Sequence, residues 1–280
     1  MFSLKKKSLV VCALIPLFLF GCSETQTTPQ ASAPELPPAE SMALDLSFFS
    51  GNNAPGVQDA AAQTKLNFLN AAVRAAFLNV AVVTILTPPH LAFAAAIHTI
   101  PSKQSDGSYL WIYTYSEDGM DYQIRLNGAP TGDKIDWELS YVLPGQSAEV
   151  WFYGQSHQEN DEGYWIFKDP EAAGKPDVFR IDWNSKSATD AFLELENIHV
   201  GHEEEGDRLT YSVDGSDALI EFEDFSTSEV FDIQWSEATG AGSLKMPEYN
   251  NGERACWNEN QEDVDCGAAA ASVVASLKSN

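Results

Sequence analysis

The spacing of hydrophobic residues along the chain changes near residue 108. Before that point, between Gly56 and Leu86, apolar residues recur every three or four positions, the spacing of one helix face: Leu66, Leu69, Val73, Phe77 and Val80. Pro88-Pro89 should end this helix, because proline lacks an N–H donor and crowds the preceding turn. Residues 90–100 predict a second, shorter helix, so the helical region is expected to span 56–100.

Within this region, residues 75–86 are apolar enough to suggest a membrane-spanning helix. A span needs roughly 20 consecutive apolar residues, and Arg74 and the double proline bound this shorter segment. A helix buried in a protein core is therefore favoured over membrane contact.

From Ser108 onward, apolar and polar residues alternate, as in half-buried strands. The clearest cases are 120–126 and 135–141, and the other candidates are 109–115, 149–153, 164–168, 178–183, 191–198, 208–213, 218–223, 230–235 and 242–246. Turn-forming pairs such as Asn127-Gly128 and Asp214-Gly215 lie between them. About eleven short strands without intervening helices predict an antiparallel meander.

We therefore expect one α+β, mainly β domain over 43–280. Its parts are the helical region 56–100, antiparallel strands over 108–246, and a disulfide loop and tail over 247–280. A sheet with one apolar face must be covered, so a long N-terminal helix should pack across a strongly curved, open barrel-like sheet. This outline is similar to that of the envelope lipid and lipoprotein carriers of the LolA and LolB type, in architecture only.

Residues 1–21 have the order of a secretory signal peptide. Lys5, Lys6 and Lys7 precede the apolar run 9–20, which is shorter than the roughly 20 residues needed to cross a bilayer. The run stops at Gly21-Cys22, which favours a cleaved signal over a permanent span.

The residues Leu19-Phe20-Gly21-Cys22 resemble the lipobox of bacterial lipoproteins. The resemblance implies cleavage between Gly21 and Cys22, acylation of Cys22 with chains such as palmitate, and anchoring in a membrane. Ser23 follows, where an Asp is associated with retention in the inner membrane, so the outer membrane is favoured, on its periplasmic or surface side. The alternative is an ordinary signal peptide. Residues 22–42 are rich in proline and polar residues and predict a disordered tether.

Acidic residues dominate the composition: 41 Asp and Glu against 16 Lys and Arg give a net charge of −25. Removing the signal deletes three lysines and no acidic residue, so the mature chain would carry −28. Nucleic acid is not an expected partner, because binding to its phosphates depends on Lys and Arg. Attraction to anionic lipid headgroups is not expected either.

Two of the four cysteines remain for the folded part, because Cys12 lies in the signal and Cys22 is the lipid site. In an oxidising compartment, Cys256 and Cys266 should form a disulfide that stabilises the fold by roughly 2–4 kcal/mol. Two thiolates alone would leave a zinc tetrahedron half empty.

Two further clusters are weak metal candidates. The first is a predicted loop with His199 and His202 followed by three glutamates, which are zinc-ligand types. The second has oxygen ligands for calcium but lacks the glycine of an EF-hand loop: Asn258, Asn260, Asp263 and Asp265. Solvated loops are preferred in both cases, so no cofactor is expected, with calcium as the alternative.

No motif supports catalysis: the sequence has no Gly-x-Ser-x-Gly elbow and no phosphate-binding glycine loop. Strand aromatics are more simply core residues than the lining of a lipid or sugar site: Trp111, Tyr113, Tyr115, Trp137, Tyr141, Trp151, Tyr153, Trp165, Phe167, Trp183, Phe231 and Trp235. We expect a non-catalytic lipoprotein domain that binds an apolar ligand or docks another envelope component. The alternatives are a calcium-assisted adhesion or glycan-binding module and a carboxylate-based envelope hydrolase.

Overall fold

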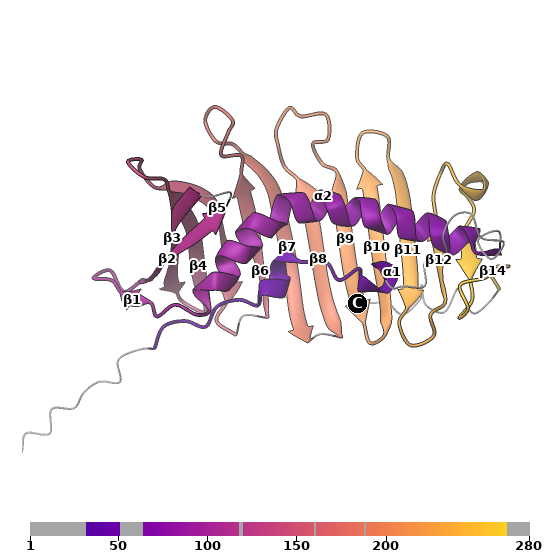
Figure 1. The fold of residues 1–280 in the computed structure, drawn as a ribbon, viewed down its shortest axis with the longest axis horizontal. Coiled ribbons are helices and arrows are strands. Elements are labelled where there is room, and N and C mark those ends of the chain that lie inside the picture. The colour runs from indigo at the N-terminus through magenta and orange to yellow at the C-terminus, as the bar shows by residue number, and fades with distance from the viewer. Residues whose placement is uncertain (1–31, 51–63, 118–119, 160, 188, 268–280) are drawn as a thin grey trace, which may run out of the picture. The chain divides into compact units, whose positions relative to one another are not determined.

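The computed structural model describes residues 32–50, 64–117, 120–159, 161–187 and 189–267 (Figure 1). The described residues from Ala33 onward belong to one compact unit, and their strands form a single sheet. The strands are β1 Ser102–Lys103, β2 Tyr109–Glu117, β3 Met120–Thr131, β4 Lys134–Val142, β5 Glu149–His157, β6 Glu162–Lys168, β7 Asp177–Ser187, β8 Asp190–Asn197, β9 Arg208–Asp214, β10 Asp217–Asp224, β11 Glu229–Ser236, β12 Gly242–Lys245, β13 Ala255–Trp257 and β14 Asp263–Val264.

Each strand pairs antiparallel with the strands next to it in sequence, from β1 to β14. The sheet is therefore mainly what alternation predicted, an antiparallel meander, and it is open, since β1 and β14 form its edges. The prediction of about eleven strands was too low. The strands without a predicted counterpart are β1, β13 and β14, which have only two or three residues each and are too short to show an alternating pattern.

One predicted turn was also wrong. Asn127 and Gly128 lie inside β3, where Gly128 pairs with Trp137 of β4. A side chain on Gly128 would meet the Trp137 ring within 2.6 Å. The glycine therefore makes room for an indole rather than a tight turn.

The helical elements are the 3-10 helices η1 Ala39–Met42 and η3 Asn250–Gly252, and the α-helices α1 Ser47–Ser50 and α2 Leu66–Ala96. α2 continues through Pro88-Pro89, so the predicted helix end at the prolines and the separate helix over 90–100 were wrong. Two interior prolines weaken a helix. Beyond them, however, Phe93 is buried with its ring centre 5.6 Å from that of Trp165. Figure 1 shows α2 bending towards its C-terminal end, the usual consequence of proline in a helix.

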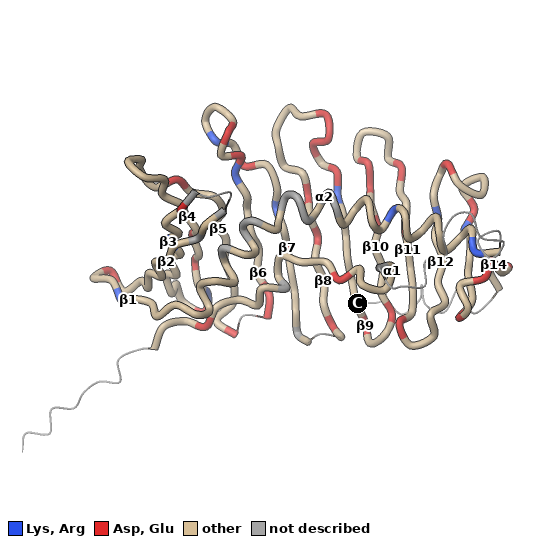
Figure 2. The backbone as a smooth tube through the Cα atoms, viewed as in Figure 1, with Lys and Arg blue, Asp and Glu red and all other residues tan. Residues whose placement is uncertain are grey.

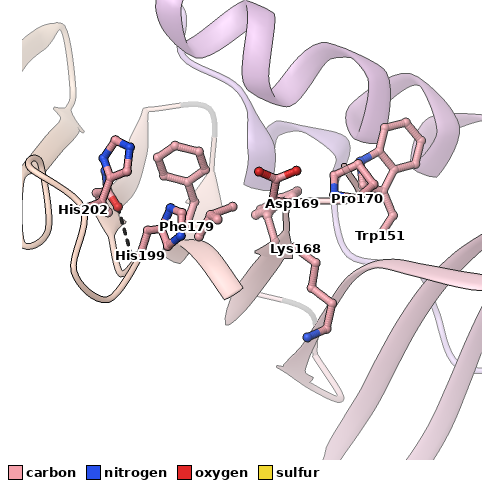
Figure 3. Close-up of a pocket in the computed structure, with 10 residues that line it drawn as sticks. Trp151, Lys168, Asp169, Pro170, Phe179, His199 and His202 are labelled. Atoms are coloured by element: carbon pink, nitrogen blue, oxygen red, sulfur yellow. Dashed lines mark hydrogen bonds between the residues drawn. The ribbon is translucent and has the colours of Figure 1, made fainter. Parts of the chain in front are cut away.

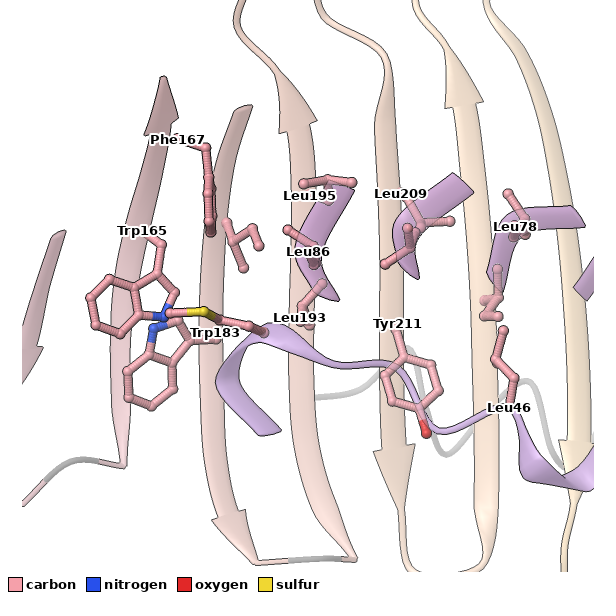
Figure 4. Packing of buried hydrophobic residues seen from close by; sticks show 14 of the residues in the cluster. Leu46, Leu78, Leu86, Trp165, Phe167, Trp183, Leu193, Leu195, Leu209 and Tyr211 are labelled. Atoms are coloured by element: carbon pink, nitrogen blue, oxygen red, sulfur yellow. The ribbon is translucent and has the colours of Figure 1, made fainter. Parts of the chain in front are cut away.

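α2 lies across one face of the sheet (Figure 1). Buried side chains occur along its inward side from the first turn to the last. The buried side chains on that side are Phe68, Ala71, Ala75, Leu78, Val82, Leu86, Phe93 and Ala96. Figure 4 shows Leu78 and Leu86 among sheet residues such as Leu195 and Leu209. Since strand residues alternate between faces, one face of the sheet is packed against α2 and the other meets water.

A second segment, the strap (residues 33–50), covers the same face beside α2. Met42, Leu46 and Phe49 are buried, and the Trp165 indole donates a hydrogen bond of 3.2 Å to the Ser41 hydroxyl. The predicted tether over 22–42 was therefore too long, because residues 33–42 belong to the folded unit. The composition of residues 22–42 did not reveal this, because only a few apolar side chains hold an otherwise polar, proline-rich segment on the sheet.

The N-terminus of α2 is held by a residue almost 200 positions away. The Asp263 carboxylate accepts the backbone N–H groups of Leu66 at 3.1 Å and Asn67 at 2.9 Å. The side chain of Asn67 extends the contact: its amide donates to the Cys256 carbonyl at 2.7 Å, and its oxygen accepts the Tyr249 hydroxyl at 2.7 Å. A carboxylate at this position satisfies free amides and favours the positive end of the helix dipole.

The Cys256–Cys266 disulfide closes the loop that carries Asp263, with 5.3 Å between the Cα atoms. The prediction of this disulfide is confirmed. The closed loop fixes the position of Asp263, so the disulfide also supports the cap on α2.

We predict that Asp263→Asn lowers the free energy of unfolding by about 1 kcal/mol, because the amide keeps one acceptor oxygen for two helix N–H groups and loses the charge that favours the helix dipole. Asp265→Asn removes the same charge nearby, and the Asp265 carboxylate accepts no hydrogen bond from the described residues, so this control should change stability by less than about 0.5 kcal/mol. Urea unfolding measures both. Equal losses would show that Asp263 acts only through its charge.

Candidate functional site

The lipid site predicted from sequence lies outside the described residues. Gly21 and Cys22 precede residue 32, where the description of the chain begins. Acylation of Cys22 and cleavage before it therefore stay predictions. The strap that follows is placed, and it enters the folded unit at Ala33.

Two of the four oxygen-rich residues considered for calcium are engaged in hydrogen bonds: Asp263 with α2 and Asn258 with its own loop. Both oxygens of Asp263 accept amides of α2, and Asn258 Oδ1 accepts the backbone N–H groups of Asn260 and Glu262 at 2.9 and 3.0 Å. Asp265 is exposed at the end of this loop. Among the described residues, no three His, Cys, Asp or Glu side chains gather as metal ligands. In this loop, the Asp263 carboxylate caps the N-terminus of α2.

His199 and His202 do come together, in the loop between β8 and β9. Their rings are stacked, with centres 5.0 Å apart and planes 12° apart (Figure 3). His202 donates its backbone N–H to the His199 carbonyl at 3.0 Å, and its Nδ1 is paired with the Glu204 carboxylate. The stacking follows from a tight turn in the loop.

These histidines border a groove that we call the loop groove, of about 330 Å³ (Figure 3). It lies between the β6–β7 and β8–β9 loops, and its lining is Trp151, Phe167, Lys168, Asp169, Pro170, Val178, Phe179, Asn197, His199 and His202. Trp151 and Phe179 are half-buried, so each offers part of a ring. Exposed ring faces beside polar groups are typical of sites that bind small polar molecules.

Both charged groups that line the loop groove have partners: Lys168 forms an ion pair, and the Asp169 carboxylate accepts the backbone N–H groups of Glu171 and Ala172. Lys168 Nζ lies 2.7 Å from the Asp177 carboxylate, which also accepts the Tyr153 hydroxyl at 2.9 Å. Burial and the bond to Asp177 raise the pKa of Tyr153 to about 12. The Tyr153 hydroxyl is thereby not placed to exchange a proton near neutral pH.

A second pair lies in the same region. Glu149 binds Lys175 and accepts the Tyr141 hydroxyl at 2.9 Å. The Lys175 ammonium and then the Tyr141 bond hold the pKa of Glu149 below its usual value, whereas burial, followed by Glu149, raises the pKa of Tyr141 to about 12. These shifts also move both groups away from neutral pH, so this region is better suited to binding than to acid–base chemistry.

The strand aromatics mostly fill the space between α2 and the sheet. Trp111, Trp137, Trp165, Phe167, Trp183 and Trp235 are buried, and Tyr113, Tyr141, Trp151 and Phe231 are half-buried against the same core. Ring contacts also join the helix to the sheet, as between Phe68 and Trp257 at 5.7 Å. The interpretation of these residues as core is supported, although the side chain of Tyr115 lies outside what is described and Tyr153 pairs with Asp177 instead.

Sequence reasoning missed the outward side of α2. We call four exposed residues there the outer stripe: Leu66, Val73, Phe77 and Leu91. Val73 and Phe77 are 65% and 73% exposed. The intervals of seven, four and fourteen residues are close to whole numbers of turns at about 3.6 residues per turn, so the four side chains lie along one line. Three of them are residues whose spacing predicted the helix, yet they face away from the core.

The charge of α2 was the signal that could have revealed this surface. Its 31 residues contain no Asp or Glu and a single Arg or Lys, Arg74, in a chain with net charge −25. Figure 2 shows acidic positions on strands and loops but not along α2. A helix exposed on one side ordinarily carries charged residues there. Within the described residues, no helix combines the length and apolarity needed to cross a membrane.

We predict that calcium at about 1 mM, a concentration at which extracellular calcium modules bind, leaves the melting temperature unchanged. The reason is that Asp263 already accepts two helix amides and would have to give them up. Thermal unfolding with calcium and with a chelator measures this. A calcium-dependent rise that disappears in Asp265→Asn would contradict the prediction.

Comparison with protein-family models, with curated proteins and with solved structures finds no match to this chain. Its function must therefore be argued from its own residues. The two surfaces that require an explanation are the loop groove and the outer stripe of α2.

Proposed function

We propose that this chain is the precursor of a lipid-anchored lipoprotein of the bacterial cell envelope, and that its folded unit is a non-catalytic docking domain. The observation that carries the docking role is the outer stripe, a line of large apolar side chains exposed along a helix without acidic residues. Large apolar side chains exposed along one side of a helix mark a candidate interaction site. The lipobox-like residues ending at Cys22 supply the anchor.

The packing beneath α2 favours docking over transport of an apolar ligand. A carrier of the LolA or LolB type would need an apolar cavity between helix and sheet. A hollow of about 480 Å³ lies beside α2, between the strap and the strands. Near the C-terminal end of α2, helix side chains and sheet rings occupy the space between helix and sheet, as in the contacts of Phe93 with Trp165 at 5.6 Å and with Phe152 at 6.4 Å. A helix fixed in this way presents a rigid outer surface, and rigid surfaces bind with a smaller loss of entropy.

The disulfide is consistent with an envelope location. Disulfides persist in oxidising compartments such as the periplasm and the cell surface, and Cys256–Cys266 joins the last strands of the fold. We place the protein at the outer membrane because Ser23, rather than Asp, follows Cys22. The strap leaves about ten residues between the anchor and the folded unit.

A second candidate function is glycan binding in the loop groove. Trp151 and Phe179 offer ring faces there, next to Asn197 and Asp169. Sugar rings stack on such faces while polar groups bind their hydroxyls. This candidate needs no calcium, and it is compatible with an anchored docking domain.

We predict that Cys22→Ala, expressed in a Gram-negative host, loses both palmitate labelling and cleavage after Gly21, because the acylated thiol directs processing. Cys12→Ala is the matched control: it removes a thiol inside the signal and should keep both. Metabolic labelling and the N-terminal mass of the product measure the outcome. A Cys22→Ala protein that is still cut at the same bond and still sediments with membranes would overturn the anchor.

A further inference from the structure

We propose that the outer stripe of α2 lies on the lipid bilayer that holds the Cys22 anchor, so that the helix rests in the membrane interface parallel to its plane. This inference rests on the proposed anchor and names the partner of the docking surface. Interfacial helices bury an apolar side in the boundary between headgroups and acyl chains.

The stripe has the length and chemistry for this contact. Over its 31 residues α2 is about 46 Å long at 1.5 Å per residue. The outer stripe runs from its first residue, Leu66, to Leu91, and beyond the helix end Ile97 and Ile100 are also exposed, Ile100 by 93%. From Leu66 to Leu91 the stripe covers about 38 Å of the helix.

The tether brings this surface to the membrane. The strap begins at Ala33, which packs against the core, and residues 33–39 share a surface hollow with Ala96 and Ile97 at the C-terminal end of α2. Residues 23–32 can span at most roughly 36 Å when fully extended. An acylated Cys22 therefore keeps the C-terminal end of α2 within that distance of the bilayer, and tethering at short range raises the effective concentration of a weak contact.

Charge selects lipid over other partners. The four stripe residues carry no hydrogen-bonding side chain and no charge, whereas protein interfaces surround an apolar centre with polar groups that need matching partners. Arg74, the only Arg or Lys of α2, is turned to its own helix, where it binds the Asn70 carbonyl and side-chain oxygen. The acid-rich strands and loops would be repelled by anionic headgroups, so zwitterionic lipid fits this surface best.

The first test measures depth. The acylated protein is reconstituted in phosphatidylcholine vesicles with brominated acyl chains, which quench tryptophan fluorescence at short range. Phe77→Trp places an indole on the stripe, and Phe225→Trp is the matched control, because Phe225 is also an exposed phenylalanine, at 63%, but lies between β10 and β11. We expect additional quenching over wild type for Phe77→Trp, insensitive to salt, and none for Phe225→Trp.

The second test measures strength. Transfer of the acylated protein from donor to acceptor vesicles should be about tenfold faster for Phe77→Asp, since one large apolar side chain contributes roughly this factor and a charge opposes burial. Phe225→Asp makes the same chemical change outside the stripe and should transfer at the wild-type rate. Circular dichroism of both variants verifies that the fold is intact.

The outcomes separate the two proposals. A protein that never associates with vesicles would overturn the anchor. Stable association without extra quenching at position 77 would leave the anchor standing and overturn the bilayer contact. In that case, concentration-dependent dimerisation would assign the stripe to a second copy, and a gain of exposed surface on deleting residues 268–280 would assign it to the end of the chain.

Discussion

The contact between α2 and the sheet is the interaction on which the rest of the fold depends. An antiparallel meander of this width has one face rich in tryptophan and leucine, and that face must be removed from water. α2 covers it with Phe68 at one end and Phe93 at the other, each against tryptophan of the sheet. Without this contact much of the aromatic face would be exposed, and the open sheet would have only the strap to pack against.

The ends of α2 are secured differently. At the N-terminus the cap is polar: Asp263 binds two helix amides from a loop that the disulfide closes. Towards the C-terminus the contact is apolar, and burial of Phe93 holds the helix on the sheet beyond two prolines. A helix fixed at both ends also fixes the sheet strands between them, because β2, next to the edge strand β1, and the edge strand β14 both contact it.

On the opposite face of the sheet, charged side chains form ion pairs, and no helix of the described residues covers them (Figure 1). Arg254 binds the buried Asp232 carboxylate through two nitrogens at 2.6 and 2.8 Å, which joins β11 to the segment before β13. Arg180 pairs with Asp182 on its own strand and lies 4.4 Å from the centre of the Tyr164 ring. Two-point contacts of this kind are stronger than single exposed ion pairs.

Alternation over two residues predicted the main strands because each strand carries its own pattern. What sequence could not supply were contacts between distant residues: the cap from Asp263 to Leu66, the strap held through Ser41, and the helix continued by Phe93 on Trp165. Helical spacing also could not say which side of α2 faces inward. Alanines fill much of the inner side, where the sheet rings leave little room, so the bulky residues that show the period lie partly outside.

This division of α2 gives the acid excess of the chain a physical role. An exposed apolar line on a helix favours aggregation, and a net charge of −25 keeps copies of the chain apart by repulsion. Figure 2 shows acidic positions on strands and loops, whereas α2 has no acidic residue and a single Arg or Lys. The residues that keep the protein soluble and the apolar outer stripe therefore lie on different elements of one domain. A tethered protein can bring α2 to a neutral surface while its acidic loops stay in water.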